Sequence, residues 1–370
     1  MQNQLKPVLI FAQSGRFLAQ SATQAGYRAW VADCFGDQET RSFAERWQQL
    51  APLSELSVDD VLNIFSKLTQ GEECMLICGS GIESLFSILD ELPDNIRLIG
   101  NSFETLHTLK TPQLFFETLN KLQLPYPDTV FSPPTDNNQW LVKSASGLGG
   151  QHIQYLNKST PVIDQYFQRY IDGLSGSVLL LANGKQAQMM SINQQILATN
   201  QHQPFQLGSI ETPWLISDHH RHALNSAISK ITLETSLLGL NSLDFIISAQ
   251  DELLLLEVNP RPSASAELIH NQATLFQHHM NACRGLLPSS PLTQVPERRS
   301  LHYIYARHDV MIPDDMSWPL ECHDRPNSGT LILRGEPICT LLIRLKEHHQ
   351  ADHSHSFIEG KISHQLLDLP

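Results

Sequence analysis

Short apolar runs alternate with helix-like stretches over the first hundred residues of the chain. Apolar runs at residues 7–12, 29–32, 74–78 and 97–100 predict strands, and residues 17–25 have the spacing of a helix that Gly26 ends. Strands separated by helices in this way are typical of a parallel β-α-β sheet. Ligands bind at the carboxyl ends of such strands, so the turns SGR (residues 14–16) and GSGIES (residues 79–84) are candidate ligand loops.

A second pattern, richer in strand signals, begins near residue 103. Residues 103–123 predict a helix, and Pro112 near its middle suits the first turn of a helix, with Lys110 just before it. The proline-rich segment 125–134 predicts a connection, and residues 140–156 are rich in strand signals. Further on, the Asn183-Gly184 pair predicts a hairpin, residues 218–238 a helix, and the stretch from 300 onward short strands. The pattern therefore predicts a mixed fold, α/β and α+β in class.

Composition narrows the class of protein. The chain has 370 residues, and its 25 Lys and Arg against 38 Asp and Glu give a formal net charge of −13. The length predicts two or three domains, and the negative charge argues against nucleic acid or an anionic membrane as the main partner. No apolar run approaches the roughly 20 residues of a membrane span, and the first apolar run is typical of a strand rather than a signal peptide. Six cysteines without a CxxC pair favour core thiols of a cytoplasmic protein over a metal or redox site.

The segment LDFIISAQDELLLLEVNPR, residues 243–261, has the pattern of a hairpin with its turn at residues 250–251. Paired positions then sum to 501, which places Asp244 opposite Glu257, position 246 opposite 255, and position 248 opposite 253. Side chains alternate along a strand, so Glu257 and Asn259 share a face. Facing carboxylates repel each other, and a divalent cation such as Mg²⁺ resolves the conflict with its preference for oxygen ligands. The alternative is a structural salt bridge from Arg261 or another cation to Glu257.

A glycine-rich turn follows the predicted strand at 140–143, which ends in Lys143. The turn reads SASGLGG, residues 144–150, and a strand-like run comes after it. A P-loop or a dinucleotide-binding loop opens a helix instead, so neither motif fits. Glycines between two strands make a turn that can fold over phosphates and donate backbone N–H groups, although an ordinary loop has the same composition.

These pieces, taken in order, resemble the ATP-grasp superfamily over residues 103–270. The resemblance rests on Lys110 at the start of a helix, Lys143 before SASGLGG, FQRYIDG at 167–173, and LDFII paired with LLLLEVNPRPSASAE. It implies ATP and Mg²⁺ as cofactors, with Mn²⁺ as an alternative metal. It also implies that residues 144–150 cover the phosphates, that residues 168–171 form an adenine hinge, and that Arg261 steadies the transferred phosphoryl group.

The residues that the resemblance implies fall into three sets. The metal ligands are Asp244, Glu257 and Asn259, and the catalytic residues are Arg261 and Lys143. The nucleotide-binding residues are Lys110, Lys143, Ser144, Ser146, Gly147, Gly149, Gly150, Gln168, Arg169, Tyr170 and Ile171. The chain departs from the family where many members have Glu in place of Arg169, which leaves the ribose contact to Asp172 or Ser177.

The resemblance also implies an organisation and an activity. The expected segments are a Rossmann-like pre-grasp domain at 1–102, a β-rich lid with its leading helix at 103–175, a core with the metal-binding hairpin at 176–295, and a C-terminal β-rich segment at 296–370. The implied enzyme is an ATP-dependent carboxylate–amine ligase, forming homodimers, that makes an amide through an acyl phosphate and releases ADP and phosphate.

The C-terminal stretch 324–341 resembles a subgroup linked to one-carbon cofactor biosynthesis in methylotrophs. This resemblance implies glutamate as the acid and a pterin or furan amine as its partner, and leaves Asp324 and Arg325 either at the site or in a structural turn. Three alternatives stay open: a carboxylase that acts through carboxyphosphate, a non-catalytic ATP-binding protein, and an NAD-binding oxidoreductase built on residues 1–102. The last is weakened because Gly79 and Gly81 lack a third glycine in register.

Overall fold

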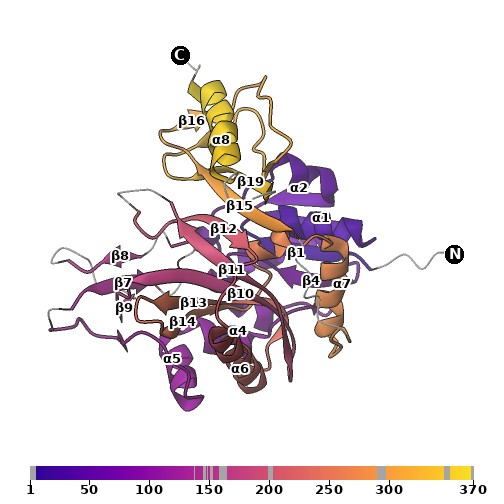
Figure 1. Cartoon of the computed structure of the whole chain (residues 1–370). Coiled ribbons are helices and arrows are strands. Elements are labelled where there is room, and N and C mark those ends of the chain that lie inside the picture. The colour runs from indigo at the N-terminus through magenta and orange to yellow at the C-terminus, as the bar shows by residue number, and fades with distance from the viewer. Residues whose placement is uncertain are drawn as a thin grey trace.

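The computed structural model describes residues 6–136, 138–144, 147, 149–150, 153–157, 165–198, 203–289, 297–345 and 351–367. Its strands form a five-stranded, a four-stranded and an eight-stranded sheet, with a two-stranded ribbon beside them. Figure 1 shows the four-stranded sheet on the left, the five-stranded sheet on the right, and the long strands β10 to β14 between them. Together with the covering helices, these sheets confirm the mixed α/β and α+β class predicted from the sequence.

The five-stranded sheet is parallel and N-terminal. In spatial order its strands are β3 (Ala44–Gln49), β2 (Ala29–Asp33), β1 (Val8–Ala12), β4 (Cys74–Cys78) and β5 (Ile96–Leu98). Helices α1 (Arg16–Gln24), α2 (Gln38–Phe43) and α3 (Val58–Thr69) connect its strands. Every side chain of β1 and β2 is buried, as expected for parallel strands covered on both faces. The turns at 14–16 and 79–84 follow β1 and β4, so both lie at the carboxyl edge, as predicted.

Two helices, rather than the single helix predicted at 103–123, lead into the four-stranded sheet. They are α4 (Phe103–Lys110) and α5 (Pro112–Lys121). Thr111 is extended because the proline ring disfavours helical geometry in the residue before it. The sheet that follows is antiparallel, with the order β6 (Thr129–Val130), β9 (Gln165–Arg169), β7 (Trp140–Ser144) and β8 (Gln154–Tyr155).

The eight-stranded sheet is antiparallel and forms the centre of the molecule. In spatial order its strands are β14 (Leu253–Asn259), β13 (Leu238–Ser248), β10 (Gly173–Asn183), β11 (Ala187–Leu197), β12 (Leu207–Thr212), β15 (Arg298–Tyr305), β19 (Pro337–Leu345) and β17 (Cys322–His323). The predicted Asn183-Gly184 hairpin joins β10 to β11. The remaining helices are α6 (Asp218–Thr235), α7 (Gln272–Ala282) and α8 (Ala351–Leu367), and the small ribbon pairs β16 (Val310–Met311) with β18 (Leu331–Ile332).

Helix α7 joins the N-terminal sheet to the central sheet. Its Phe276 and Met280 pack in the core cluster of β1 and α1, while Leu275 packs with Leu179 and Leu240 of the central sheet. The opposite face of the central sheet is covered by apolar side chains of α5 and α6. The face toward α7 and the N-terminal sheet is therefore the one on which a site between the sheets can form. Within the described residues, no helix combines the length and the apolar character needed to cross a membrane.

Candidate active site

The hairpin of β13 and β14 brings together the predicted metal ligands. Asp244 lies directly opposite Glu257, as predicted, and Asn259 lies opposite Ser242. The Asn259 Nδ2 donates a 3.4 Å hydrogen bond to Asp244 Oδ2. Two carboxylates and an amide therefore share one face, which is a donor set that suits Mg²⁺.

The rest of the predicted hairpin register is wrong. A bulge between Asp244 and Phe245 shifts the pairing, so Ile246 faces Leu254 rather than position 255, and Ile247 rather than Ser248 faces position 253. The turn explains the shift, because the Ser248 amide bonds to the Glu252 carbonyl and lengthens the loop by one residue. The bulge between Asp244 and Phe245 restores the predicted register, so the two carboxylates face each other.

The electrostatics of the hairpin favour a cation. Burial raises the pKa of Asp244, and the negative charge of Glu257 raises it further, while the Gln195 side chain, Lys110 and Arg261 lower it only in part. Among the described residues, no three His, Cys, Asp or Glu side chains form a metal-binding group. The donor set is thus limited to two carboxylates with an amide, which fits a Mg²⁺ ion that also takes water and phosphate ligands.

Lys110 is the cation that contacts this pair. It ends α4, two residues before α5 begins, rather than starting a helix, and its Nζ lies 3.1 Å from Glu257 Oε2. The Lys110 side chain is buried whereas that of Glu257 is 45% exposed, so the ammonium approaches the carboxylate from the protein side. The structural salt bridge considered as an alternative therefore exists, with Lys110 as a cation, while Arg261 pairs with Glu83.

Lys143 lies on β7, at the end of the strand that leads into the glycine-rich turn. Its Nζ donates a 2.7 Å hydrogen bond to Gln168 Oε1, and the Gln168 Nε2 in turn donates to Thr129 Oγ1. Burial lowers the pKa of Lys143 to about 8, although the charges of Glu257 and Asp244 act to raise it. Gln168 is one of the predicted hinge residues, and in the structure its side chain accepts the hydrogen bond of the Lys143 ammonium.

The other predicted hinge residues connect the four-stranded sheet to the central sheet. Arg169 points toward solvent and pairs with Asp128 at 3.2 Å, with both side chains largely exposed. The Tyr170 amide donates to the Gln139 carbonyl, and its ring lies 5.6 Å from that of Tyr155. Ile171 follows, two residues before β10 begins.

The glycine-rich turn contacts the start of β12 in the central sheet. Ser144 ends β7, and Gly147 is described without regular structure, whereas Ser146 lies outside the described residues. Gly149 and Gly150 have φ values of +60° and +76°, a conformation that favours glycine. The Gly149 carbonyl accepts a 3.1 Å hydrogen bond from the amide of Leu207, the first residue of β12.

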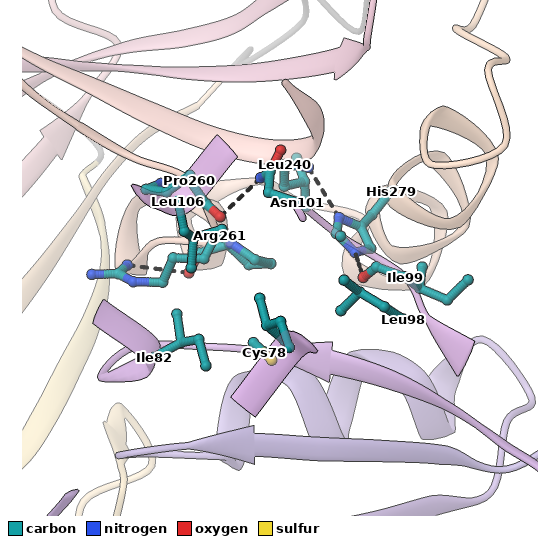
Figure 2. Close-up of a pocket in the computed structure, with 13 residues that line it drawn as sticks. Cys78, Ile82, Leu98, Ile99, Asn101, Leu106, Leu240, Pro260, Arg261 and His279 are labelled. Carbon is teal, nitrogen blue, oxygen red and sulfur yellow. Dashed lines mark hydrogen bonds between the residues drawn. The ribbon is translucent and has the colours of Figure 1, made fainter. Parts of the chain in front are cut away.

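Arg261 leaves the hairpin toward the N-terminal sheet. Its Nε donates a 2.7 Å hydrogen bond to Glu83 Oε1, in the GSGIES turn that was a candidate ligand loop. Glu83 itself was not predicted as a site residue, although its place at the carboxyl end of a strand was the signal that could have found it. Figure 2 shows Arg261 next to Pro260, whose carbonyl accepts a hydrogen bond from Asn101. The cavity in that view measures about 10 Å³, so it admits a single water and no nucleotide.

Asp324 and Arg325 make ion pairs outside this group of residues. Asp324 binds the buried Arg16 at 2.9 Å, and Arg325 binds Glu39 at 3.0 Å. Arg16 belongs to the other candidate ligand loop, the SGR turn, and is also paired with Glu267. These contacts tie the C-terminal strands to the carboxyl edge of the N-terminal sheet.

Known proteins resemble the chain in sequence and in fold. The family model described as an ATP-grasp domain matches residues 113–265. The large chain of carbamoyl phosphate synthase from Caldanaerobacter subterraneus subsp. tengcongensis is 21% identical over 237 residues, which cover 58% of this chain and 22% of that protein. The chain thus spans about a fifth of the length of this curated relative.

Solved structures share the fold over nearly the whole chain. N5-carboxyaminoimidazole synthetase from Staphylococcus aureus, complexed with ADP, has a TM-score of 0.69 at 16% identity and covers 96% of this chain and 98% of its own. Biotin carboxylase from Campylobacter jejuni has a TM-score of 0.72 at 12% identity, with coverage of 97% and 92%. The L-amino acid ligase from Bacillus licheniformis has a TM-score of 0.66 at 13% identity, with coverage of 98% of both chains.

Proposed function

We propose that the protein is an ATP-dependent ligase that activates a carboxylate and joins it to an amine, on the premise that its residues 113–265 match the family model of an ATP-grasp domain. The observation that carries the proposal is the meeting of Asp244 and Glu257 beside Lys110. Facing carboxylates are unfavourable unless a cation binds them, and a partly exposed pair next to a buried lysine suits a metal that carries phosphate. The ADP complex of the similar N5-carboxyaminoimidazole synthetase supports the same choice of ligand.

The residues of the chain would act by position and charge. Asp244, Glu257 and Asn259 would hold Mg²⁺, which would neutralise negative charge on the phosphate oxygens when bound. Lys143 and Lys110 would bind phosphate oxygens of ATP, and Arg261 would stabilise the charge on the transferred phosphoryl group. The turn that contains Gly149 and Gly150 would keep water from the reacting groups.

The proposed reaction needs no protein nucleophile. A carboxylate oxygen of the substrate attacks the γ-phosphorus of ATP, and the bond from that phosphorus to ADP breaks. The amine nitrogen then attacks the acyl phosphate, phosphate leaves, and the nitrogen loses one proton. Positioning and electrostatic stabilisation supply most of the rate enhancement in such transfers.

The finer proposal is an amino acid, glutamate first, as the acid and a pterin or furan amine as the acceptor. Support comes from the resemblance of residues 324–341 to a subgroup of one-carbon cofactor biosynthesis and from the structural similarity to an L-amino acid ligase. A carboxylase that acts through carboxyphosphate is the second candidate, because biotin carboxylase and N5-carboxyaminoimidazole synthetase share the fold. We place the enzyme in the cytoplasm as part of this proposal, since its six cysteines are free thiols.

The test measures release of ADP and phosphate from Mg·ATP. One arm supplies amino acids with pterin or furan amines, and the other supplies bicarbonate without an amine. Ligase activity requires the acid and the amine together, whereas carboxylase activity depends on bicarbonate. Bound ADP with no phosphate release in either arm would instead identify a non-catalytic ATP-binding protein.

The variant Glu257→Gln tests the metal assignment in the same assay. We expect turnover to fall at least about 100-fold while the fold is kept, because an amide replaces a carboxylate ligand. Glu252→Gln is the matched control, since Glu252 is exposed in the turn of the same hairpin. Near-normal turnover in Glu257→Gln would refute the metal site.

A further inference from the structure

The N-terminal segment of the chain holds Arg261 at two points. The Asn101 Nδ2 donates a 2.9 Å hydrogen bond to the Pro260 carbonyl, which fixes the backbone immediately before the arginine (Figure 2). Glu83 Oε1 accepts a 2.7 Å hydrogen bond from the Arg261 Nε, which fixes one edge of the guanidinium. Backbone and side chain are therefore both positioned by residues that lie before the ATP-grasp domain in sequence.

Each of these two holders is itself held firmly. Asn101 is buried, and its amide also donates to Asn241 Oδ1 and accepts from the Leu238 amide. The Glu83 residue is 5% exposed, and its second carboxylate oxygen accepts a 2.8 Å hydrogen bond from the Gly81 amide. Neither side chain can change rotamer without losing a buried hydrogen bond. Both partners of the arginine are therefore preorganised.

Glu83 stays ionised in this setting. Burial acts to raise the pKa of Glu83, but the charges of Arg261 and Lys110 outweigh it and lower the pKa. A buried ion pair contributes little net stability, because desolvation of both charges offsets their attraction. What such a pair does supply is a fixed orientation of the planar guanidinium, whose other nitrogens then point in defined directions.

We propose that Glu83 is the positioning residue for Arg261, orienting its guanidinium toward the phosphoryl group that the enzyme transfers. The inference rests on the proposed function and adds a role for the turn at residues 79–84. Through this contact the N-terminal sheet sets the geometry of phosphoryl binding, although its residues lie outside the ATP-grasp domain.

Product-side binding tests the role without knowledge of the acid or the amine. MgADP is titrated into the full chain, and inorganic phosphate is then titrated into the MgADP complex, with heat as the readout. In Glu83→Gln we expect MgADP affinity to stay within about twofold and phosphate affinity to fall at least about tenfold, which corresponds to about 1.4 kcal/mol. Glu83→Asp keeps the charge with a shorter reach, so its loss of phosphate affinity should be smaller.

Glu39→Gln is the matched control for removing a buried glutamate from an arginine. Glu39 is 7% exposed and lies 3.0 Å from the Arg325 Nε. We expect both affinities to match those of the unmodified chain in this variant. Thermal unfolding of every variant shows that the fold is kept, and where Glu83→Gln does not fold the Glu83→Asp variant carries the test.

A double variant separates positioning from general support of the fold. If Glu83 acts through Arg261, phosphate affinity in Arg261→Gln will not fall further when Glu83→Gln is added. A further fall, an unchanged phosphate affinity in Glu83→Gln, or equal losses of MgADP and phosphate affinity would overturn the inference. Absence of MgADP binding in the unmodified chain would refute the proposed function itself, and MgADP binding without phosphate binding would overturn only the role of Arg261 and Glu83.

Discussion

Replacing Asp244 by Asn should stabilise the protein without metal and remove its response to metal. The carboxyl is partly buried opposite Glu257, so burial and the like charge both raise its pKa. A carboxyl whose pKa is higher in the folded than in the unfolded protein binds its proton more tightly in the folded state. Stability is therefore lost as the pH rises from the unfolded pKa, near 4, through the folded value.

The size of the effect follows from the linkage between protons and folding. Burial and the charge of Glu257 raise the pKa of Asp244 to about 8, so each pH unit between the unfolded and the folded value costs about 1.4 kcal/mol of stability. An amide has no proton to lose and pays no such cost. The stability gained in Asp244→Asn should therefore be about 1.4 kcal/mol at pH 5 and at least about twice that at pH 8.

Metal binding should offset the advantage of Asp244→Asn. A ligand at about 100 times its dissociation constant stabilises the folded state by about 2.7 kcal/mol. In the presence of ADP, added Mg²⁺ should raise the unfolding temperature of the unmodified chain by several degrees and leave that of Asp244→Asn unchanged. Thermal unfolding at pH 5 and pH 8, with ADP and with or without Mg²⁺, measures both effects.

The matched control is Asp251→Asn. Asp251 lies in the turn of the same hairpin, its side chain is 82% exposed, and its φ of +66° is one that Asn tolerates. This variant should keep the pH dependence and the Mg²⁺ response of the unmodified chain. The reasoning is refuted if Asp244→Asn is the less stable protein at pH 8 without metal, or if it retains the stabilisation by Mg²⁺.

Three further predictions concern Lys143, His279 and the glycine-rich turn. Lys143→Met should weaken MgADP binding about tenfold or more in calorimetry, because it removes a buried ammonium beside the metal pair; unchanged affinity would argue against a phosphate contact. Burial lowers the pKa of His279 to about 4, so its contribution to stability should fade as the pH drops from about 6.5 to 4, and His279→Gln should flatten that slope in acid unfolding. Gly150→Ala should reduce nucleotide affinity more than Gly149→Ala, since both glycines have positive φ but only at Gly150 would a Cβ clash, with the Phe205 carbonyl; equal losses would show that the clash is unimportant.

The sequence predicts the facing positions of Asp244 and Glu257 well because the decisive information is local. Alternation along two strands and a polar turn suffice to place Asp244 opposite Glu257. The same pattern fails for the pairs nearer the turn, because the bulge beside Phe245 absorbs one residue and leaves no trace in the alternation of apolar and polar positions. Similarly, Pro112 signals a helix start, yet only the backbone shows that the preceding helix has already ended.

Contacts between segments that are distant in the sequence could not be predicted from the sequence. Glu83 and Arg261 are 178 residues apart, and nothing in the GSGIES turn marks its glutamate as the partner of an arginine in the hairpin. Gln168 is one of the predicted hinge residues, and its side chain accepts a hydrogen bond from Lys143 across neighbouring strands. Strand order and relative orientation of the sheets decide both contacts, and neither follows from hydrophobic periodicity.

The pairing of charges in the site also explains how a chain of net charge −13 can accept an anion as highly charged as ATP. Lys110 is held by Glu257, Arg261 by Glu83, and Lys143 by the neutral Gln168. A divalent cation at Glu257 would compete with Lys110 for that carboxylate, and the displaced ammonium would turn toward the incoming phosphates. Metal and nucleotide would then each favour the other, because the ion offsets the acidic pair while releasing a lysine that the nucleotide needs. Arg261 keeps its acidic partner throughout, since Glu83 lies in the turn after β4 and is not among the proposed metal ligands.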